Sequence, residues 1–531
     1  MTEMTMGSTG TRGTSVSLPL IAVAAALLAF LGMEVTAFLS TGGYFEYPLD
    51  DVYIHLSMAE EIARGGYGIN EGEFASAASS PLYPFLLTPF AGTEAHRFLP
   101  VAWNAVGLIL AAFLWGRTLA LAGYGRMTQA WPGIALAALG PLAVNAYGLA
   151  YTGMEHTLHL AATLAIVCGL TRFVIEGRIG PALLLGVFFS PAFRLEGLAL
   201  ALSAAGMVAV LGRWRAGFLL GFAALIPALA FVGFLLSLGL DPLPNSVNAK
   251  LALPGTEEYG LPARFLATML LNLTEFPGWI ILGLSLLSLA SAPLLGAGGR
   301  NDLRLFCYAI GFSGLAHMGL GLVGWLNRYE IYILGALVLG LAAILGLAGA
   351  NARGCRPIAA IFAVLTLAGG SYYLVTALQS GRWASLGIHL QQGQMARFAQ
   401  DFAHRPVAVN DIGRVAWGNP HYVLDLWGLA SDEARQLRLT GDDPRWVGTL
   451  AAEHGVGVAM VYDSWVGDYV GEDWVKLGSL DLRIPRAVLG GWVVTFYATS
   501  PELVPELTEA LREFAPTLPD RSVFTFAEPR G

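Results

Sequence analysis

Long apolar blocks fill the first 380 residues of the chain, and a mixed polar and apolar sequence follows them. Because a helix needs roughly 20 apolar residues to cross a bilayer, this pattern predicts about eleven crossing segments. The stretch 80–90 is too short to cross and is expected to form a hairpin or an interfacial helix. The predicted segments, of which 181–193 is short, are 18–39, 98–120, 128–149, 155–173, 181–193, 197–212, 216–239, 277–297, 305–324, 329–350 and 356–378.

Residues 381–531 carry shorter patterns, in which strand-like and helix-like stretches alternate. Such alternation is typical of an α/β domain. The predicted fold class is therefore a polytopic α-helical membrane protein with a C-terminal extracytoplasmic α/β domain. The expected strands are 407–410, 456–462 and 492–497, and the expected helices are 389–404, 444–454 and 501–514.

Four parts of the chain follow from these patterns: an N-terminal tail (1–17), a membrane domain (18–380), its first extracytoplasmic loop (41–80) and the soluble domain (381–531). The first apolar block could be a cleaved signal peptide. It is long for that role, and the polar residues before it include only one arginine. A retained first span is the favoured interpretation.

The composition agrees with a membrane protein and argues against some classes of function. The chain is 55% hydrophobic and 13% charged, whereas soluble domains contain about 25% charged residues. A net charge of −8 argues against nucleic-acid binding, which requires a basic face. Cys168, Cys307 and Cys355 lack metal-ligand spacing. No glycine-rich dinucleotide motif or P-loop is present, so nothing in the sequence requires a nucleotide cofactor or a nucleotide-sugar donor.

Arginines predict the orientation of the membrane domain. Under this segmentation they fall on one side, which the positive-inside rule makes cytoplasmic. An odd number of crossings then places the C-terminal domain outside, as expected for a protein of the bacterial inner membrane. The arginines are Arg12, Arg117, Arg126, Arg172, Arg178, Arg213, Arg215, Arg300, Arg304, Arg353 and Arg356.

Charged motifs collect on the opposite, outer side. Scattered structural charges have no reason to avoid the arginine-rich side, so this bias points to an outward-facing site. The motifs are 47–56 with Asp50 and Asp51, Gly153-Met-Glu-His156, Arg194-Leu-Glu-Gly197, Leu243-Pro-Asn-Ser-Val-Asn-Ala-Lys250 and Asn327-Arg-Tyr-Glu330.

The first motif predicts a short interfacial helix that begins with two adjacent acids. Val52, Leu56 and Ala59 recur at helical spacing, and Gly65 should end the helix. Asp50 can cap this helix, and capping alone would explain a single aspartate. A second acid beside a membrane is harder to explain structurally, because unpaired charge there is costly.

These motifs, with Ser79-Ser-Pro-Leu-Tyr83, resemble those of GT-C glycosyltransferases, in particular bacterial arabinofuranosyl- and mannosyltransferases that use polyprenyl-phosphate sugars. The sequence departs from that pattern at Leu195, where the family often has proline, and at Glu330, where it usually has an apolar residue. The resemblance implies an inverting transfer from a polyprenyl-phosphate sugar to a glycan, lipid or protein acceptor, with membrane lipid around the site.

The resemblance and the chemistry of transfer assign expected roles to the motif residues. An acceptor hydroxyl needs a carboxylate base, and a departing phosphate needs cations. Asp50 is the expected base, with Asp51 as its partner and Glu155 orienting the acceptor or holding a metal. The expected phosphate ligands are Lys250, Arg328 and Arg194, and the expected lining residues are Tyr53, His55, Asn245, Asn248 and Tyr329.

Several alternatives stay open at this level. Arg194 could instead pair structurally with Glu196. Asp50, Asp51 and Glu155 could hold a divalent ion, to which His55, His156 and His159 could add, although a hydrogen-bonded helix histidine is the more common case. Asp411 and Asp425 fit loop structure after a strand better than catalysis. A transporter or flippase of a lipid-linked or anionic substrate is the alternative function, because intramembrane charges also mark transport paths.

Overall fold

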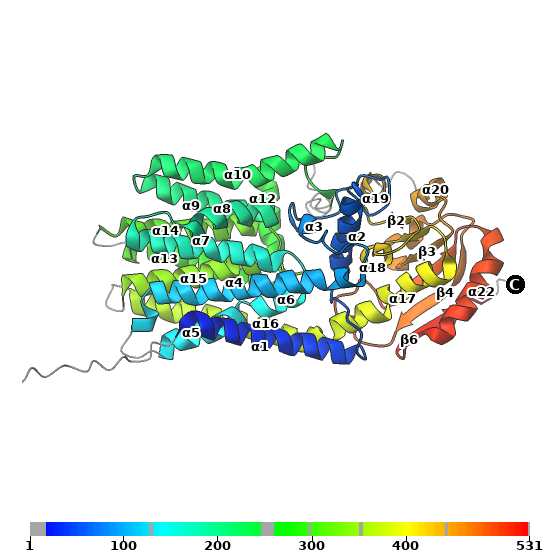
Figure 1. Ribbon diagram of the computed structural model, residues 1–531, viewed down its shortest axis with the longest axis horizontal. Coiled ribbons are helices and arrows are strands. Elements are labelled where there is room, and N and C mark those ends of the chain that lie inside the picture. Colours follow the sequence, from blue (N-terminus) through cyan, green and yellow to red (C-terminus); the bar gives the residue numbers. More distant parts are fainter. Residues whose placement is uncertain are drawn as a thin grey trace, which may run out of the picture.

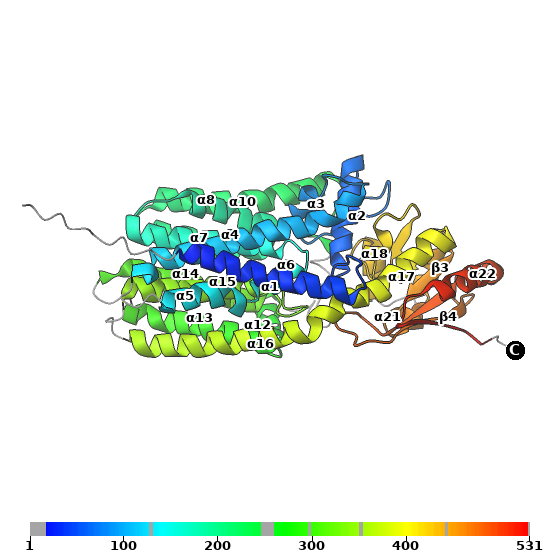
Figure 2. The ribbon, with the colours of Figure 1, turned by 60° about the horizontal axis from the view of Figure 1, so that its bottom comes forward.

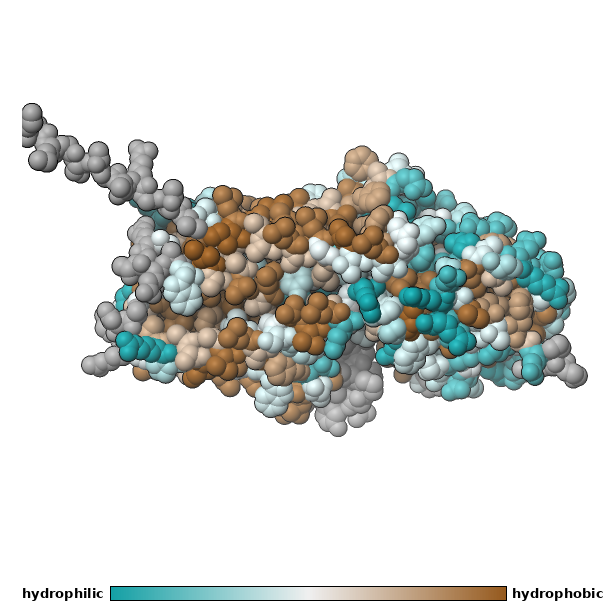
Figure 3. Space-filling view, turned by 90° about the horizontal axis from the view of Figure 1, so that it is seen from below, coloured by the Kyte–Doolittle hydropathy of each residue, from teal (hydrophilic) through white to brown (hydrophobic). Residues whose placement is uncertain are grey.

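The computed structural model describes residues 17–126, 131–245, 260–295, 299–349, 354–440 and 444–528. It confirms the predicted arrangement of a polytopic helical domain and an α/β domain: a bundle of apolar helices is joined end to end to a C-terminal α/β domain (Figure 1). On the face shown in Figure 3, hydrophobic side chains predominate over the bundle and hydrophilic ones over the C-terminal domain. The protein is therefore a multi-pass membrane protein.

Eight helices in the described ranges are long and apolar enough to cross a membrane. Three shorter apolar helices complete a set that matches the eleven predicted segments. The long helices are α1 (Leu18–Ser40), α4 (Leu99–Leu121), α7 (His156–Glu176), α10 (Trp214–Ser237), α13 (Phe276–Leu295), α14 (Asn301–Leu320), α15 (Ile331–Ala348) and α16 (Cys355–Leu390). The short ones are α5 (Trp131–Ala143), α8 (Pro181–Phe193) and α9 (Leu198–Val210).

Two breaks interrupt the bundle beside the charged motifs. The segment predicted at 128–149 is not continuous, because Asn145 adopts a left-handed φ of 54° and a separate helix, α6 (Ala146–Tyr151), follows it. A second break lies at Arg194, which is extended between α8 and the 3₁₀ turn Leu195–Gly197. Main-chain breaks at membrane depth persist only where protein or a cavity surrounds them.

Both α1 and α16 lead to the end of the bundle that carries the C-terminal domain, and the N-terminal end of α1 lies at the other end (Figures 1 and 2). The first loop and the C-terminal domain therefore share one end, as the odd number of crossings predicts. α16 runs on as a 36-residue helix into α17 (Gln392–Arg397) and the π-helix Phe398–Ala403. The predicted domain boundary at residue 381 falls inside α16.

A six-stranded mixed sheet forms the C-terminal domain, in the order β2-β1-β3-β5-β4-β6. The first three strands in that order are parallel, and the others are antiparallel. The strands are β1 (Val407–Val409), β2 (Val423–Asp425), β3 (Val458–Val461), β4 (Val475–Leu482), β5 (Val493–Ala498) and β6 (Ser522–Phe526). The predicted strands correspond to β1, β3 and β5.

Helices cover both faces of this sheet, because successive side chains of a strand point to opposite faces. Val407 and Val409 pack in a cluster with the π-helix and α22 (Val504–Phe514), whereas Ala408 packs with α20 (Trp446–Glu453). α19 (Asp432–Thr440) packs against α20 on the same side. The first cluster also contains Ile54 and Met58 of the first loop, so the two domains share a core.

Polar contacts reinforce the junction between the first loop and the C-terminal domain. The carboxylate of Asp50 accepts from the main-chain N–H groups of Gly413 (2.6 Å) and Arg414 (2.8 Å), which open α18 (Gly413–Ala416). The Asn70 amide pairs with both main-chain groups of Val423, at 2.9 and 3.1 Å. The alternative that Asp50 caps its own helix does not hold: in the described chain its side chain makes no such bond and caps α18 instead.

Gly413 is expected to be essential for this junction. A Cβ atom at this position would lie 2.0 Å from the main-chain oxygen of Asp50. Gly413→Ala should therefore lower the free energy of unfolding by about 1–3 kcal/mol, the usual cost of overpacking. Thermal unfolding and limited proteolysis of the purified chain would measure this change.

Gly206→Ala is the matched control, because nothing lies within 4 Å of a Cβ atom there. If both alanine variants melt and resist protease like the unchanged chain, the junction is looser than described.

Candidate active site

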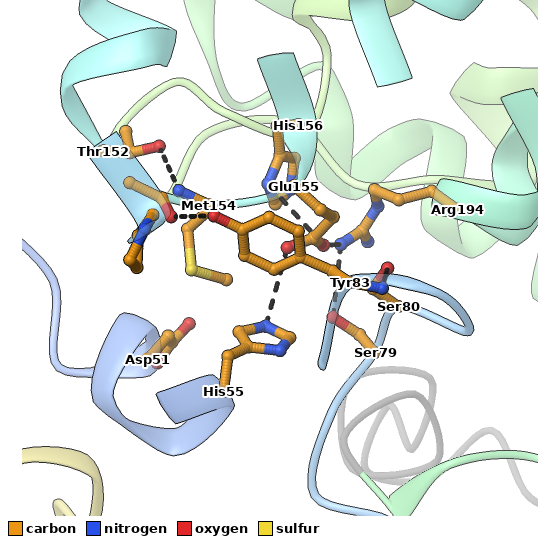
Figure 4. A network of polar contacts seen from close by, with 12 residues as sticks. Asp51, His55, Ser79, Ser80, Tyr83, Thr152, Met154, Glu155, His156 and Arg194 are labelled. Carbon is orange, nitrogen blue, oxygen red and sulfur yellow. Dashed lines mark hydrogen bonds and ion pairs between the residues drawn. The ribbon is translucent and has the colours of Figure 1, made fainter. Parts of the chain in front are cut away.

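Helix α2 (Asp51–Arg64) presents Asp51 and His55 one turn apart toward the bundle (Figure 4). Val52 and Leu56 are buried on its packed face, and Gly65, with a φ of 92°, ends it as predicted. The Asp51 side chain is 30% exposed and lines a cavity of about 290 Å³, here called the base cavity. Its other lining residues are Ile54, His55, Ala77, Ser79, Met154, Leu322, Trp325, Arg328, Tyr329, Trp427 and Leu429.

Arg328 forms the opposite side of the base cavity. Its Nη2 atom donates to the Asp51 carboxylate and to the Tyr329 hydroxyl at 3.0 Å. The residue is only 1% exposed, and its Nε and Nη1 atoms have no hydrogen-bond partner among the described residues. A buried guanidinium with unused donors is suited to bind an anion.

Glu155 and Arg194 form a second ion pair above α2, and Figure 4 shows Arg194 between Glu155 and Ser79. Arg194 Nη1 donates to Glu155 Oε1 at 2.7 Å and to Ser79 Oγ at 3.2 Å, while Nη2 donates to Glu196 at 2.6 Å. Arg194 thus pairs with Glu196, as the sequence analysis considered, and also with Glu155. His55 Nε2 lies 3.5 Å from Glu155 Oε2 and links this pair to α2.

The turn before α7 places Glu155 in this position. Gly153 has a φ of 74°, and a Cβ atom there would lie 2.6 Å from the Tyr47 ring, so only glycine fits without strain. The Tyr83 hydroxyl donates to the Gly153 carbonyl at 2.7 Å, which ties the Ser79-Ser-Pro-Leu-Tyr83 motif to the Gly-Met-Glu motif. Two separate sequence motifs therefore meet at one turn.

A second, largely apolar cavity of about 560 Å³ opens from the same place, here called the tail cleft. It shares Ser79, Leu322 and Tyr329 with the base cavity. Apolar side chains of α9 and α14 line its length, and Arg194 with Glu196 lies at its polar end. The apolar lining residues include Leu198, Ala199, Leu202, Ala316 and Leu320, and the polar ones include His317 and Tyr332.

Both arginines lie close to the ring of Tyr329. Its ring centroid lies 5.0 Å from the guanidinium carbon of Arg328 and 5.4 Å from that of Arg194. Both distances fit cation–π contacts. The ring thus holds two cations at the junction of the base cavity and the tail cleft.

The segment that carries Trp325 and Arg328 has an uncommon backbone. Trp325, Leu326 and Asn327 all adopt left-handed φ values, between 49° and 60°. Such a conformation is costly for residues with a side chain, so surrounding contacts must hold it. Buried Glu330 accepts from the Gly324 N–H and the Tyr373 hydroxyl, both at 3.0 Å. This role accounts for an acid where the family pattern has an apolar residue.

Asn272 holds the start of the same segment. Its side-chain oxygen accepts from the Val323 N–H at 3.0 Å, and its amide donates to the carbonyls of Met318 and Gly321 at 3.0 and 2.9 Å. Both ends of the strained turn are therefore anchored.

The C-terminal domain supplies residues to the base cavity that sequence analysis did not propose: Trp427 and Leu429. The Asp425 carboxylate holds their loop by accepting from the N–H groups of Trp427 (2.8 Å) and Ala430 (2.7 Å). This agrees with the interpretation of Asp425 as a loop residue. Their neighbour Asp425 was considered in the sequence, but only the three-dimensional fold brings this loop to the cavity that Asp51 lines.

The other predicted lining residues lie elsewhere or cannot be placed. The Tyr53 hydroxyl donates to Glu46, and its ring lies 5.4 Å from the Arg414 guanidinium carbon, toward the C-terminal domain. Asn245 is buried, and its main-chain N–H donates to Ser76. Asn248 and Lys250 lie outside the described residues.

No three His, Cys, Asp or Glu side chains in the described ranges gather as a metal site would require. Glu155 is held by Arg194, and Asp50 by main-chain N–H groups, so the residues proposed for a divalent ion do not converge.

Asp50 and Asp51 differ in their surroundings. Burial, with the nearby charge of Asp411, raises the pKa of Asp50 above its ordinary value, although two main-chain N–H groups favour its charged form. Burial likewise raises the pKa of Asp411. Geometry, which decides first whether a carboxylate can act as a base, distinguishes the two adjacent aspartates. Asp51 faces the base cavity, and Asp50 faces α18.

The sequence was compared with protein families and with curated proteins. A family described as a domain of unknown function (DUF8728) matches residues 384–498, within the C-terminal part of the chain. No curated protein matches the sequence.

Two solved structures are similar in overall arrangement. ArnT from Cupriavidus metallidurans bound to undecaprenyl phosphate shares 14% identity over 91% of this chain and 98% of its own, with a TM-score of 0.47. The Archaeoglobus fulgidus oligosaccharyltransferase in the apo form shares 11% identity over 98% of this chain and 76% of its own, with a TM-score of 0.48. At these TM-scores the similarity carries no inference about the reaction.

Replacing Glu330 tests how the strained turn is held. Glu330→Leu should leave the Gly324 N–H and the Tyr373 hydroxyl buried without an acceptor, which costs about 1–3 kcal/mol per group. Thermal unfolding should show this loss. Glu330→Gln is the matched control, because its amide can accept from Gly324 and donate to Tyr373. Equal melting temperatures for the Leu and Gln variants would contradict this role.

Proposed function

We propose that this protein is an integral-membrane glycosyltransferase that moves a sugar from a polyprenyl-phosphate donor to an acceptor on the extracytoplasmic side. One observation carries the proposal: an acid–arginine pair, Asp51 and Arg328, lines the base cavity, which adjoins the largely apolar tail cleft. The donor has the same two-part character, an anionic head on a long apolar tail. The motif resemblance supports the same reaction.

The tail cleft suits the lipid part of the donor. Apolar side chains of α9 and α14 line it, and Leu202 and Leu320 are 41% and 64% exposed on the outside of the bundle. A polyprenyl chain can enter from the bilayer between these helices and bury its apolar surface. Its phosphate would then reach Arg194 and Arg328, both of which lie close to the Tyr329 ring. Lys250 stays a predicted third phosphate ligand.

Asp51 is the proposed base, in place of Asp50. In the reaction, Asp51 accepts the proton of the acceptor hydroxyl, and the acceptor oxygen forms a bond to the anomeric carbon. The bond from that carbon to the phosphate oxygen breaks, and the electron pair leaves with the polyprenyl phosphate. Cations near the phosphate stabilise the charge that develops on it. This single displacement inverts the anomeric centre.

The ion pair also suggests an order of binding. Arg328 bonds to Asp51 through Nη2 and keeps Nε and Nη1 for another acceptor. A phosphate bound to Arg328 competes with Asp51 for the cation and frees the carboxylate to accept a proton. Donor binding would thus prepare the base before the acceptor hydroxyl reacts.

Aspartate variants separate the two candidate bases. Asp51→Asn should lower the rate of transfer on the order of 100- to 10,000-fold, the usual loss for a general base. Asp50→Asn should lower it less than tenfold and should act mainly on stability, because one amide oxygen still accepts from α18. Sugar transfer by purified protein would be measured beside thermal unfolding.

Asp51→Glu adds a control for folding, because it keeps the charge paired with Arg328 while it moves the carboxylate. A folded Asp51→Asn variant with full transfer would contradict the proposed base, and the opposite ranking of the two Asn variants would restore Asp50 to that role.

Arg328 is expected to contribute mainly to binding of the lipid donor. Arg328→Gln removes a charged partner of the phosphate, and losing one partner of a buried charge pair costs about 2–5 kcal/mol. We expect the KM for the lipid donor to rise about 30-fold or more, with Arg328→Lys less affected. Arg512→Gln, at a side chain that is 67% exposed, should leave this KM unchanged. An unchanged donor KM in folded Arg328→Gln would assign Arg328 a structural role.

A further inference from the structure

A third cavity, of about 870 Å³, lies between the helical bundle and the C-terminal domain. It adjoins the base cavity, with which it shares Leu322, Trp325 and Tyr329. The turn before α13 contributes Thr274 and Glu275, and α16 contributes Tyr372 and Thr376. Residues 486–490 and Trp465 of the C-terminal domain close the other side. A ligand in this cavity would reach Asp51 without entering the tail cleft.

Tryptophan side chains line the route from this cavity to Asp51 on both walls. On the bundle side, Trp325 lines both cavities and is 61% exposed. On the C-terminal side, Trp427 lines the base cavity and Trp465 lines the third cavity. The centroids of these two rings lie 4.5 Å apart, so their surfaces are continuous.

The tryptophans are held in place before any ligand binds. Arg438 packs over the Trp427 ring, with its guanidinium carbon 4.0 Å from the centroid, and its Nε atom donates to the Trp427 carbonyl at 3.0 Å. Asp425 holds the same loop from the other side. Trp325 sits on the left-handed turn that Glu330 anchors. Such preorganisation lowers the entropy that a ligand loses on binding.

The chemistry of the lining selects a class of ligand. Aromatic faces carry negative charge density and attract the polarised C–H groups on the flat face of a sugar ring. Asn327 and Thr376 offer uncharged hydrogen-bonding groups for hydroxyls. Glu275 and Arg486 bring one charge of each sign, so the lining favours neither a polyanionic nor a polycationic ligand. The volume falls in the upper part of the range of about 300–1,000 Å³ for ligand sites.

We propose that the third cavity binds the acceptor, and that the acceptor is a neutral oligosaccharide whose sugar rings stack on Trp465 and Trp325. The terminal hydroxyl of this chain reaches Asp51 between Trp325 and Trp427. This assignment rests on the proposed transfer reaction and adds the class of acceptor to it.

Direct binding tests this assignment. The purified full-length protein, without donor, would be titrated with linear neutral oligosaccharides of two to six units built from glucose, mannose, galactose or arabinofuranose. We expect at least one series to bind with an affinity that rises with length. Trp465→Ala and Trp325→Ala should each weaken that affinity about tenfold, and Trp465→Phe should retain most of it.

Trp214→Ala is the matched control, because this tryptophan is 66% exposed at the start of α10, at the opposite end of the bundle (Figure 1). It should bind like the unchanged protein. Because no donor is present, failure of the transfer reaction would leave this measurement unaffected. Absence of binding across the panel would overturn the assignment, as would binding that the two tryptophan variants leave unchanged. Preferential binding of an acidic peptide or an anionic glycolipid would overturn it as well.

Discussion

The burial of two guanidinium groups is the constraint on which the rest of the site depends. Arg194 and Arg328 are 5% and 1% exposed, at the end of an otherwise apolar bundle. A buried charge is stable only when other groups compensate it. Asp51, Glu155 and Glu196 provide that compensation, and they come from three separate parts of the chain. The arginines therefore draw the first loop, the turn before α7 and the break after α8 into one place.

The same constraint explains why the C-terminal domain belongs to the site. Asp51 begins α2, and its neighbour Asp50 is bonded to the main chain of α18. A displacement of the C-terminal domain would move both α2 and the Trp427 loop, and with them two walls of the base cavity. The shared hydrophobic cluster and the Asp50 contacts make this domain a structural part of the site.

Sequence reasoning located most of the membrane domain, because long apolar segments depend on composition alone. It also assigned Asp51, Glu155, Arg194 and Arg328 to one site from their motifs alone. It could not foresee that Asp50 caps α18, because the groups that Asp50 bonds lie more than 360 positions further along the chain. Local patterns cannot report such contacts.

β2, β4 and β6 escaped prediction for a related reason. β2 has three residues, β4 has an irregular register between Lys476 and Gly478, and the edge strand β6 is partly exposed, so none of them shows a clear alternating pattern. The sequence did not indicate that Trp427 and Trp325 line the base cavity. Each lies on a loop whose conformation depends on contacts with other parts of the protein. Glu330 stood out in the sequence only as a departure from the family pattern. Its carboxylate accepts hydrogen bonds from Gly324 and Tyr373, which explains why an acid stands at this position.

Locating the bound lipid phosphate tests most directly whether the tail cleft holds the donor, because a second apolar groove could also hold a polyprenyl chain. That groove, of about 540 Å³, lies between α1, α5 and α16 and is lined by residues such as Met33, Leu139 and Gly370. A polyprenyl phosphate with a photoreactive group beside the phosphate would be cross-linked to the purified protein and mapped by mass spectrometry. If the donor binds in the tail cleft, α9 and α14 should be labelled saturably around Leu198 and Ala316. Labelling confined to the groove of α1, α5 and α16 would contradict donor binding in the tail cleft.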